Sequence, residues 1–364
     1  MDEQWDFNLK DNIEEFLKKL QDDENFYIFN PVIKGNTKFG KSLGLGFSCY
    51  ALKCFYMLGL WDSLDKQDRD MWIEYINSFQ KDLKGLPINS FIDKEVVNFY
   101  TSFTSKFGIK NILKFILNLF NIKKVSTNEK KYIETIRAES KQAIATLYEV
   151  GYENEKKYLD FPRTEIEINT FLDDLNWDTP WTAGAQFSAI CVFSATQLVN
   201  KEKEENIKNL YSYLNKIVDY ESGFYHKDIP VNDRELINGA MKVITGLDWI
   251  NRPIHYPEKI IDFCLKHEPN PEGCDIVDTV YVLFKCFQQS EYKREEINHY
   301  FDNVKIIISE HFNAEYNSFS YYKEKSQDYY YGLKITEGRK EPDIHGTTLL
   351  LWAMSMIYNF QGKK

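Results

Sequence analysis

The feature that most constrains the fold is a unit that recurs along the chain. It consists of a glycine or turn, an apolar run of helical length, and an amphipathic run that ends in a turn. The first copy begins at residue 43 (LGLGFSCYALKCFYMLG), and similar copies begin at Gly184 (GAQFSAICVFSATQLV) and Gly273 (GCDIVDTVYVLFKCF). Repeated supersecondary units of this kind determine the architecture before any functional site is considered.

Six runs of helical length are apolar on several sides, and six amphipathic, more charged stretches alternate with them. The apolar runs span about 43–59, 134–150, 182–199, 235–250, 273–288 and 344–360. The amphipathic stretches span about 8–20, 65–80, 163–175, 203–219, 256–267 and 294–311. A helix that is apolar all round is buried, whereas a helix with one apolar stripe lies outside. The alternation predicts an all-α fold, an (α/α)6 toroid with two concentric layers of helices, in which only short turns pair as strands.

The chain shows no sign of division into domains. No linker rich in proline, glycine or serine interrupts its 364 residues, so we expect a single toroid domain over 1–364. Residues 106–124 (KFGIKNILKFILNLFNIKK) depart from the repeat and predict a basic amphipathic helix, inserted at about 100–125. Such a helix either packs on the rim of the ring or contacts a membrane surface, and its apolar run is too short to span a bilayer.

Charge and composition narrow the function classes. A net charge of −10 argues against a nucleic-acid binder, which needs clustered lysines and arginines that outnumber nearby acids. The acidic amino terminus lacks the basic and apolar segments of a signal peptide, so we expect a cytoplasmic protein. The six cysteines form no pair with zinc-finger spacing and are expected to be reduced.

One turn carries a resemblance to a known superfamily. Residues 72–80 (WIEYINSFQ), followed by Gly85, Phe91 and Asp93, resemble the repeat of the terpenoid cyclases and protein prenyltransferases, and 219–228 and 312–324 are degraded copies. The resemblance implies an α/α toroid whose site is a cavity at the centre of the ring. The acidic DxDD motif of the cyclases is absent. Prenyltransferases hold zinc through Asp, Cys and His, and the resemblance offers Cys274, Asp278 and His345 as a zinc alternative to our main expectation of no cofactor.

The same helix starts carry the predicted acid and base. Asp275 and Asp278 open the apolar run at 273, and Asp343 and His345 open the run at 344. Helix amino termini favour nearby carboxylates, although capping alone accounts for any single aspartate there. We expect Asp275 or Asp278 to be the general acid or base, with His345 as its partner and Asp343 in the same site.

The densest local signal is residues 177–186 (WDTPWTAGAQ). Tryptophan faces stack on sugars or bury isoprenoids, while carboxylate and amide groups bind hydroxyls. Alternatively, both tryptophans fill a gap between helices. The predicted substrate-binding residues are Trp177, Asp178, Trp181, Gln186, Asn238 and His226. Lys242 shares a helix face with Asn238 by its spacing of four residues.

These observations favour an enzyme that acts on a carbohydrate or glycoconjugate, as a lyase, hydrolase or epimerase, in a central acidic and aromatic cavity. We expect a small-molecule or glycan substrate that is neutral or weakly charged. One alternative is a terpenoid cyclase or prenyltransferase-like enzyme with an isoprenoid substrate. Another is a toroid that binds a glycan or protein without catalysis.

Overall fold

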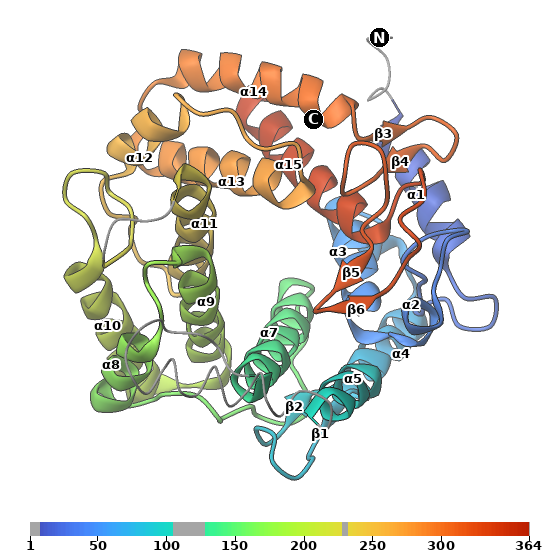
Figure 1. The fold of residues 1–364 in the computed structure, drawn as a ribbon, viewed down its shortest axis with the longest axis horizontal. Coiled ribbons are helices and arrows are strands. Elements are labelled where there is room, and N and C mark those ends of the chain that lie inside the picture. Colours follow the sequence, from blue (N-terminus) through green and yellow to red (C-terminus); the bar gives the residue numbers. More distant parts are fainter. Residues whose placement is uncertain (1–7, 105–127, 228–231, 364) are drawn as a thin grey trace.

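Six helices form the inner wall of a closed ring (Figure 1). They are α3 (Leu45–Met57), α7 (Asn128–Glu149), α9 (Pro180–Gln197), α11 (Asp233–Trp249), α13 (Gly273–Ser290) and α15 (Ile344–Gln361). Each packs against the next in this order, and α15 packs against α3, which closes the ring. The computed structural model describes residues 8–104, 128–227 and 232–363, so the helix expected at 106–124 lies outside the described residues.

Six further helices lie around this wall and alternate with it in sequence (Figure 1). They are α1 (Leu9–Leu20), α4 (Lys66–Asn77), α8 (Glu165–Asp174), α10 (Asn200–Ile217), α12 (Pro257–Cys264) and α14 (Arg294–Ser309). The predicted (α/α)6 toroid is confirmed, with every inner and outer helix at its expected place. The remaining helical segments are α2 (Lys38–Ser42), η1 (Trp61–Ser63) and α5 (Lys94–Thr104). No helix within the described ranges is both long and apolar enough to cross a membrane.

The two layers differ in burial as their sequences predict. Nearly every side chain of α9 and α13 is buried. The outer helix α10 instead buries one stripe, which includes Ile207, Leu210, Leu214 and Ile217 at helical spacing. A helix in the inner wall contacts a neighbour on each side and an outer helix behind it, so it needs apolar residues on several faces.

The inner helices α9 and α11 approach each other closely at two glycines. A Cβ atom on Gly239 would lie 2.6 Å from the Cβ atom of Pro180, and one on Gly184 would lie 3.0 Å from the Gly239 carbonyl oxygen. The ring can close at this spacing only because both positions lack a side chain.

Short hairpins follow several of the outer helices. The pairs are β1 (Gln80–Lys81) with β2 (Ser90–Phe91), β3 (Phe312–Asn313) with β4 (Ser318–Phe319), and β5 (Tyr329–Tyr330) with β6 (Leu333–Lys334), all antiparallel. Isolated bridges Gln21↔Phe29 and Val218↔Tyr225 form similar turns after α1 and α10. Three of these hairpins are the turns that resemble the superfamily repeat, and their local pairing agrees with the prediction.

The hairpins are tied to the amino ends of inner helices. Asp93 follows β2, and its Oδ2 accepts hydrogen bonds from the backbone N–H groups of Gly44 (2.8 Å) and Leu45 (3.3 Å) at the start of α3. A carboxylate there satisfies backbone donors that have no partner within the helix. The hairpin connections are thereby fixed at the end of the ring where the predicted site residues begin their helices.

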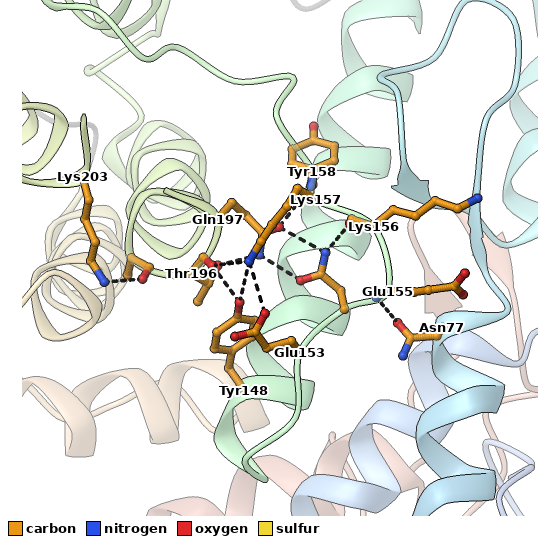
Figure 2. A network of polar contacts seen from close by, with 12 residues as sticks. Asn77, Tyr148, Glu153, Glu155, Lys156, Lys157, Tyr158, Thr196, Gln197 and Lys203 are labelled. Carbon is orange, nitrogen blue, oxygen red and sulfur yellow. Dashed lines mark hydrogen bonds and ion pairs between the residues drawn. The ribbon is translucent and has the colours of Figure 1, made fainter. Parts of the chain in front are cut away.

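The connection after α7 is held by side-chain amides (Figure 2). Gln197, at the end of α9, accepts a hydrogen bond from the Tyr158 backbone N–H (3.0 Å), and Gln80 accepts one from Lys156 (2.9 Å). Asn77, at the end of α4, accepts from the Glu155 backbone N–H (3.1 Å). These bonds tie the connection after α7 to the ends of α4 and α9.

Candidate functional site

Side chains from five of the six inner helices meet inside the ring. We call this set the central cluster: Tyr50 (α3), Lys141 (α7), Lys242 (α11), Cys274 and Asp278 (α13), and His345 (α15). Lys242 links the set, because its Nζ lies 3.5 Å from Asp278 Oδ1 and its charge acts on His345, Lys141 and Cys274. The helices that supply the cluster are far apart in sequence, and closure of the ring brings them together.

Solvent reaches the cluster although protein surrounds it. Asp278 is only 1% exposed, whereas Tyr50, Lys141, Lys242, Cys274 and His345 are each partly exposed. These helices bury almost all of the side chains that face other helices. Partial exposure of mutually interacting residues therefore indicates a solvent-accessible interior at this level of the ring.

Asp278 has the properties of a proton-transfer group. Burial raises the pKa of its carboxyl group to about 6, an effect that Lys242 opposes and the charge of Asp275 reinforces. Its Oδ1 faces Lys242, and its Oδ2 is buried without a hydrogen-bond partner among the described residues. A buried carboxylate oxygen without a partner costs free energy unless a ligand satisfies it.

Lys141 is an unpaired amine beside this carboxyl group. Burial, together with the charges of Lys242 and Lys53, lowers its pKa to about 7. Within the described part of the chain, no carboxylate forms an ion pair with Lys141. Lysines that lose most of their contact with water are usually paired, so an unpaired Lys141 is exceptional.

His345 is held between two tyrosine rings. It stacks on Tyr50 (centroids 4.5 Å apart) and on Tyr321 (5.4 Å), which comes from the segment before α15. Its Nδ1 lies 2.8 Å from Gln327 Oε1, so with the amide placed this way Nδ1 carries the hydrogen and Nε2 is an acceptor. Burial, together with the charge of Lys242, lowers the pKa of His345 to about 3, and the ring is neutral at pH 7.

Cys274 contributes a protonated thiol. Burial, together with the charge of Asp278, raises its pKa to about 11, and its sulfur lies against the Tyr321 hydroxyl. Among the described residues, no group of three or more His, Cys, Asp or Glu side chains is positioned to hold a metal ion. The zinc alternative of Cys274, Asp278 and His345 is therefore not assembled as a ligand set.

Asp275 points away from the cluster, although it lies one helical turn from Asp278. Its Oδ1 accepts hydrogen bonds from Arg234 Nε (2.9 Å) and from Asn238 Nδ2. Arg234 also contacts Glu272 (2.8 Å), and Asp275 and Asn238 line a separate pocket of about 410 Å³ between α11 and the segment before α13. Of the two aspartates predicted as acid or base, only Asp278 belongs to the central cluster.

Asp343, which the sequence predicts as catalytic, caps α15, and its catalytic role stays a prediction. Its Oδ2 accepts from the backbone N–H groups of Tyr321 (2.8 Å) and Gln327 (3.0 Å), and its Oδ1 accepts from Gly346 (2.8 Å). Burial raises its pKa to about 6, while these hydrogen bonds favour the ionised form. Asp343 is a helix cap that also fixes the loop bearing Tyr321.

Trp177, which the sequence predicts as a substrate-binding residue, is buried, and its role in binding stays a prediction. The residue is 1% exposed, its Nε1 donates to the Leu172 carbonyl (2.9 Å), and its ring packs near Tyr213 of α10. It fills the gap between two outer helices, which was the alternative. Trp181 is partly exposed, but Arg234 covers its ring at 5.3 Å.

The other predicted binding residues lie outside the cluster. Gln186 is 5% exposed and accepts from Arg137 Nη1 (2.6 Å). Asp178 is partly exposed in the turn before α9. His226 lies beside the hairpin after α10, with its Nε2 3.8 Å from Asp219 Oδ2. Their roles in substrate binding stay predictions.

Tyr50, Lys141 and Tyr321 were not predicted from the sequence. Lys141 carried little signal, because its run at 134–150 also contains Arg137, Glu139 and Glu149. Tyr50 and Tyr321 carried none, since tyrosines are frequent throughout this chain.

Comparisons with known proteins give two distant likenesses. No protein-family model matches the chain, and none of the curated proteins matches it. The structure of cellobiose 2-epimerase from Bacillus thermoamylovorans B4167 is similar over 96% of this chain and 98% of that chain, with 12% identity and a TM-score of 0.45. A possible member of the GH105 family from Salmonella enterica is similar over 97% and 94%, with 10% identity and a TM-score of 0.45. At these TM-scores, we draw nothing about function from either likeness.

Proposed function

We propose that the central cluster is the active site of an enzyme that acts on a carbohydrate or glycoconjugate by acid–base chemistry, as a lyase, hydrolase or epimerase. The observation that carries the proposal is the pair formed by Asp278 and Lys242. It places a carboxyl group of raised pKa, with one unpartnered oxygen, beside an ammonium group in a solvent-accessible interior. Carboxyl groups with a pKa near the working pH are effective in proton transfer.

Each cluster residue has a role that its environment supports. Asp278, ionised above pH 6, accepts a proton from the substrate or from an attacking water through its Oδ2. Lys242 stabilises the charge of Asp278 and lies close to any negative charge that develops on the substrate. His345 is too weak a base to carry protons at neutral pH, so its Nε2 serves better as a hydrogen-bond acceptor for a sugar hydroxyl.

The polarity of the cluster favours a sugar over an isoprenoid. An isoprenoid chain beside Lys141 and Lys242 would strip water from two ammonium groups and return no hydrogen bonds. Sugar hydroxyls would satisfy those groups and would pack their apolar faces against the tyrosines. The expectations of no cofactor and of a cytoplasmic protein remain predictions.

The proposal is tested by turnover of a panel of mono- and oligosaccharides, both neutral and acidic, followed by proton NMR. This readout detects epimerisation, elimination and hydrolysis alike. We expect turnover by the native protein and a loss of about 10²–10⁴-fold in Asp278→Asn, the usual contribution of a general acid or base. Asp248→Asn is the matched control, because Asp248 pairs with Lys285 (2.9 Å) outside the cluster.

Two results would overturn the proposal. Full turnover by Asp278→Asn would move the active site away from the central cluster. Saccharide binding without turnover of any substrate would instead indicate the non-catalytic toroid.

A further inference from the structure

Two lysines of the inner helices form close ion pairs. Lys53 of α3 lies 2.6 Å from Glu149 Oε2, and Lys285 of α13 lies 2.9 Å from Asp248 Oδ2. Each of these ammonium groups is neutralised by a carboxylate at hydrogen-bond distance.

Lys141 and Lys242 are not neutralised in this way. No described carboxylate forms an ion pair with Lys141, and the carboxylate nearest to Lys242 is Asp278 at 3.5 Å. Both lysines are partly exposed, and their charges act on each other between α7 and α11. Two ammonium groups that share one carboxylate leave an excess of positive charge inside the ring, which attracts an anion.

We propose that Lys141 and Lys242 bind the carboxylate or phosphate group of an acidic sugar, so that the substrate is an anionic carbohydrate. The sugar part of this inference rests on the proposed function. The anion replaces the carboxylate that Lys141 lacks, and it holds the sugar ring beside Asp278 and His345. This substrate class differs from the neutral or weakly charged substrate that the sequence favours.

The site has a distinctive dependence on pH. Lys141 is faced by Lys53 from α3, Cys191 from α9, Lys242 from α11 and Asp278 from α13, with Glu149 on its own helix. Its pKa in the free protein is about 7, so a bound anion must raise that pKa and draw a proton into the complex. Affinity for the anion then falls as the pH rises above 7, by up to about tenfold per pH unit.

The experiment is isothermal titration of the full chain with four probes at pH 6.5 and pH 8.5: galacturonate, galactose 6-phosphate, galactose and inorganic phosphate. At pH 6.5 we expect at least one sugar anion to bind at least tenfold more tightly than galactose. The same anion should bind more weakly at pH 8.5 than at pH 6.5. The tighter of the two sugar anions identifies which acidic group the site takes.

Three variants separate this site from a structural role. Lys141→Met should lose tenfold or more in affinity for the sugar anion, and a much smaller factor in affinity for galactose, which offers Lys141 only hydroxyl groups. Lys141→Arg should keep the affinity and lose its pH dependence, because a guanidinium does not titrate in this range. Lys285→Met should match the native protein in every measurement, since Lys285 lies outside the cluster.

The failures of the two proposals differ. Galactose binding as tightly as both sugar anions overturns this inference and leaves the proposed function intact. If inorganic phosphate binds as tightly as galactose 6-phosphate, the site recognises the anion alone, and the claim that it binds an acidic sugar is overturned. Loss of anion binding in Lys141→Arg, with its fold intact, overturns the role of charge at this position. Absence of binding by every sugar overturns the inference, and the turnover panel then decides the proposed function separately.

Discussion

Lys242 Nζ lies 3.5 Å from Asp278 Oδ1, across the contact between α11 and α13. Burial is the main cause of the lowered pKa values of Lys141 and His345, and the charge of Lys242 also lowers both. One side chain therefore influences the protonation of groups from three other inner helices. That coupling is typical of active sites, although ion-pair networks in structural cores also produce it.

The catalytic rate should have a narrow optimum between about pH 6 and pH 7. Asp278, which Lys242, Lys141 and Asp275 face, must lose its proton to act as acceptor, so kcat/KM rises as the pH passes its pKa of about 6. Lys141 must keep its proton to bind the anion, so kcat/KM falls as the pH passes about 7. A pH profile of kcat/KM from 5 to 9 measures both limbs, and Lys141→Arg should lack the falling one. A flat profile would contradict both assignments.

Glu139→Gln should stabilise the protein more at pH 8 than at pH 5. Glu139 is 1% exposed, Tyr330 donates to its Oε1 (3.2 Å), and its Oε2 has no partner among the described residues. Burial, together with the charge of Asp93, raises its pKa to about 8 from a usual value near 4.5. The folded state thus holds a proton that the unfolded state releases, and native stability is lost as the pH rises from about 4.5 to 8.

The amide of glutamine does not ionise, so the variant does not lose stability in this way as the pH rises. We expect the gap in unfolding free energy between variant and native protein to widen by about 1–3 kcal/mol from pH 5 to pH 8, from 1.36 kcal/mol per pKa unit. Urea unfolding at both pH values measures it. Glu149→Gln, which breaks an ion pair with Lys53, should show no such widening, and an equal gap at both pH values in Glu139→Gln would refute the raised pKa.

Asp343→Ala should lower stability and spare the chemistry. Three backbone N–H groups lose their acceptor, at a cost of about 2–4 kcal/mol for a buried cap. Below its unfolding temperature the variant should keep its turnover within a few-fold of the native protein. Thermal unfolding and turnover of the same sample decide the point, and lost turnover at unchanged stability would restore a catalytic Asp343.

Gly239→Ala should destabilise the contact between α9 and α11. The new Cβ would lie 2.6 Å from Pro180 Cβ and 2.9 Å from its carbonyl carbon, which cannot move without the helix. Overpacking of this kind costs about 1–3 kcal/mol. The control is Gly246→Ala on the same helix, where the nearest atoms are side-chain atoms of Phe187 and Cys191 at 3.0 and 3.1 Å. Urea unfolding measures the loss of stability in both variants. A larger loss in Gly246→Ala than in Gly239→Ala would show that α9 can shift to accommodate the new Cβ at position 239.

The sequence by itself determined the ring. The inner helix Pro180–Gln197 was expected at about 182–199 and the outer helix Arg294–Ser309 at about 294–311. Whether a helix is apolar on all sides or along one stripe depends only on its own sequence. The pattern can therefore be recognised without knowing which helices pack against it. Their alternation specifies which layer each helix joins.

Only the tertiary structure decided which side chains form the site. Asp275 and Asp278 differ by about 60° around one helix. Because of that rotation, Asp275 accepts a hydrogen bond from Arg234, whereas Asp278 faces Lys242 in the ring interior. Trp177 and Asp343 are residue types that are frequent in binding sites, but here their hydrogen-bonding groups bond to neighbouring backbone groups. A site is defined by neighbours that are distant in sequence, and those neighbours meet only when the ring closes.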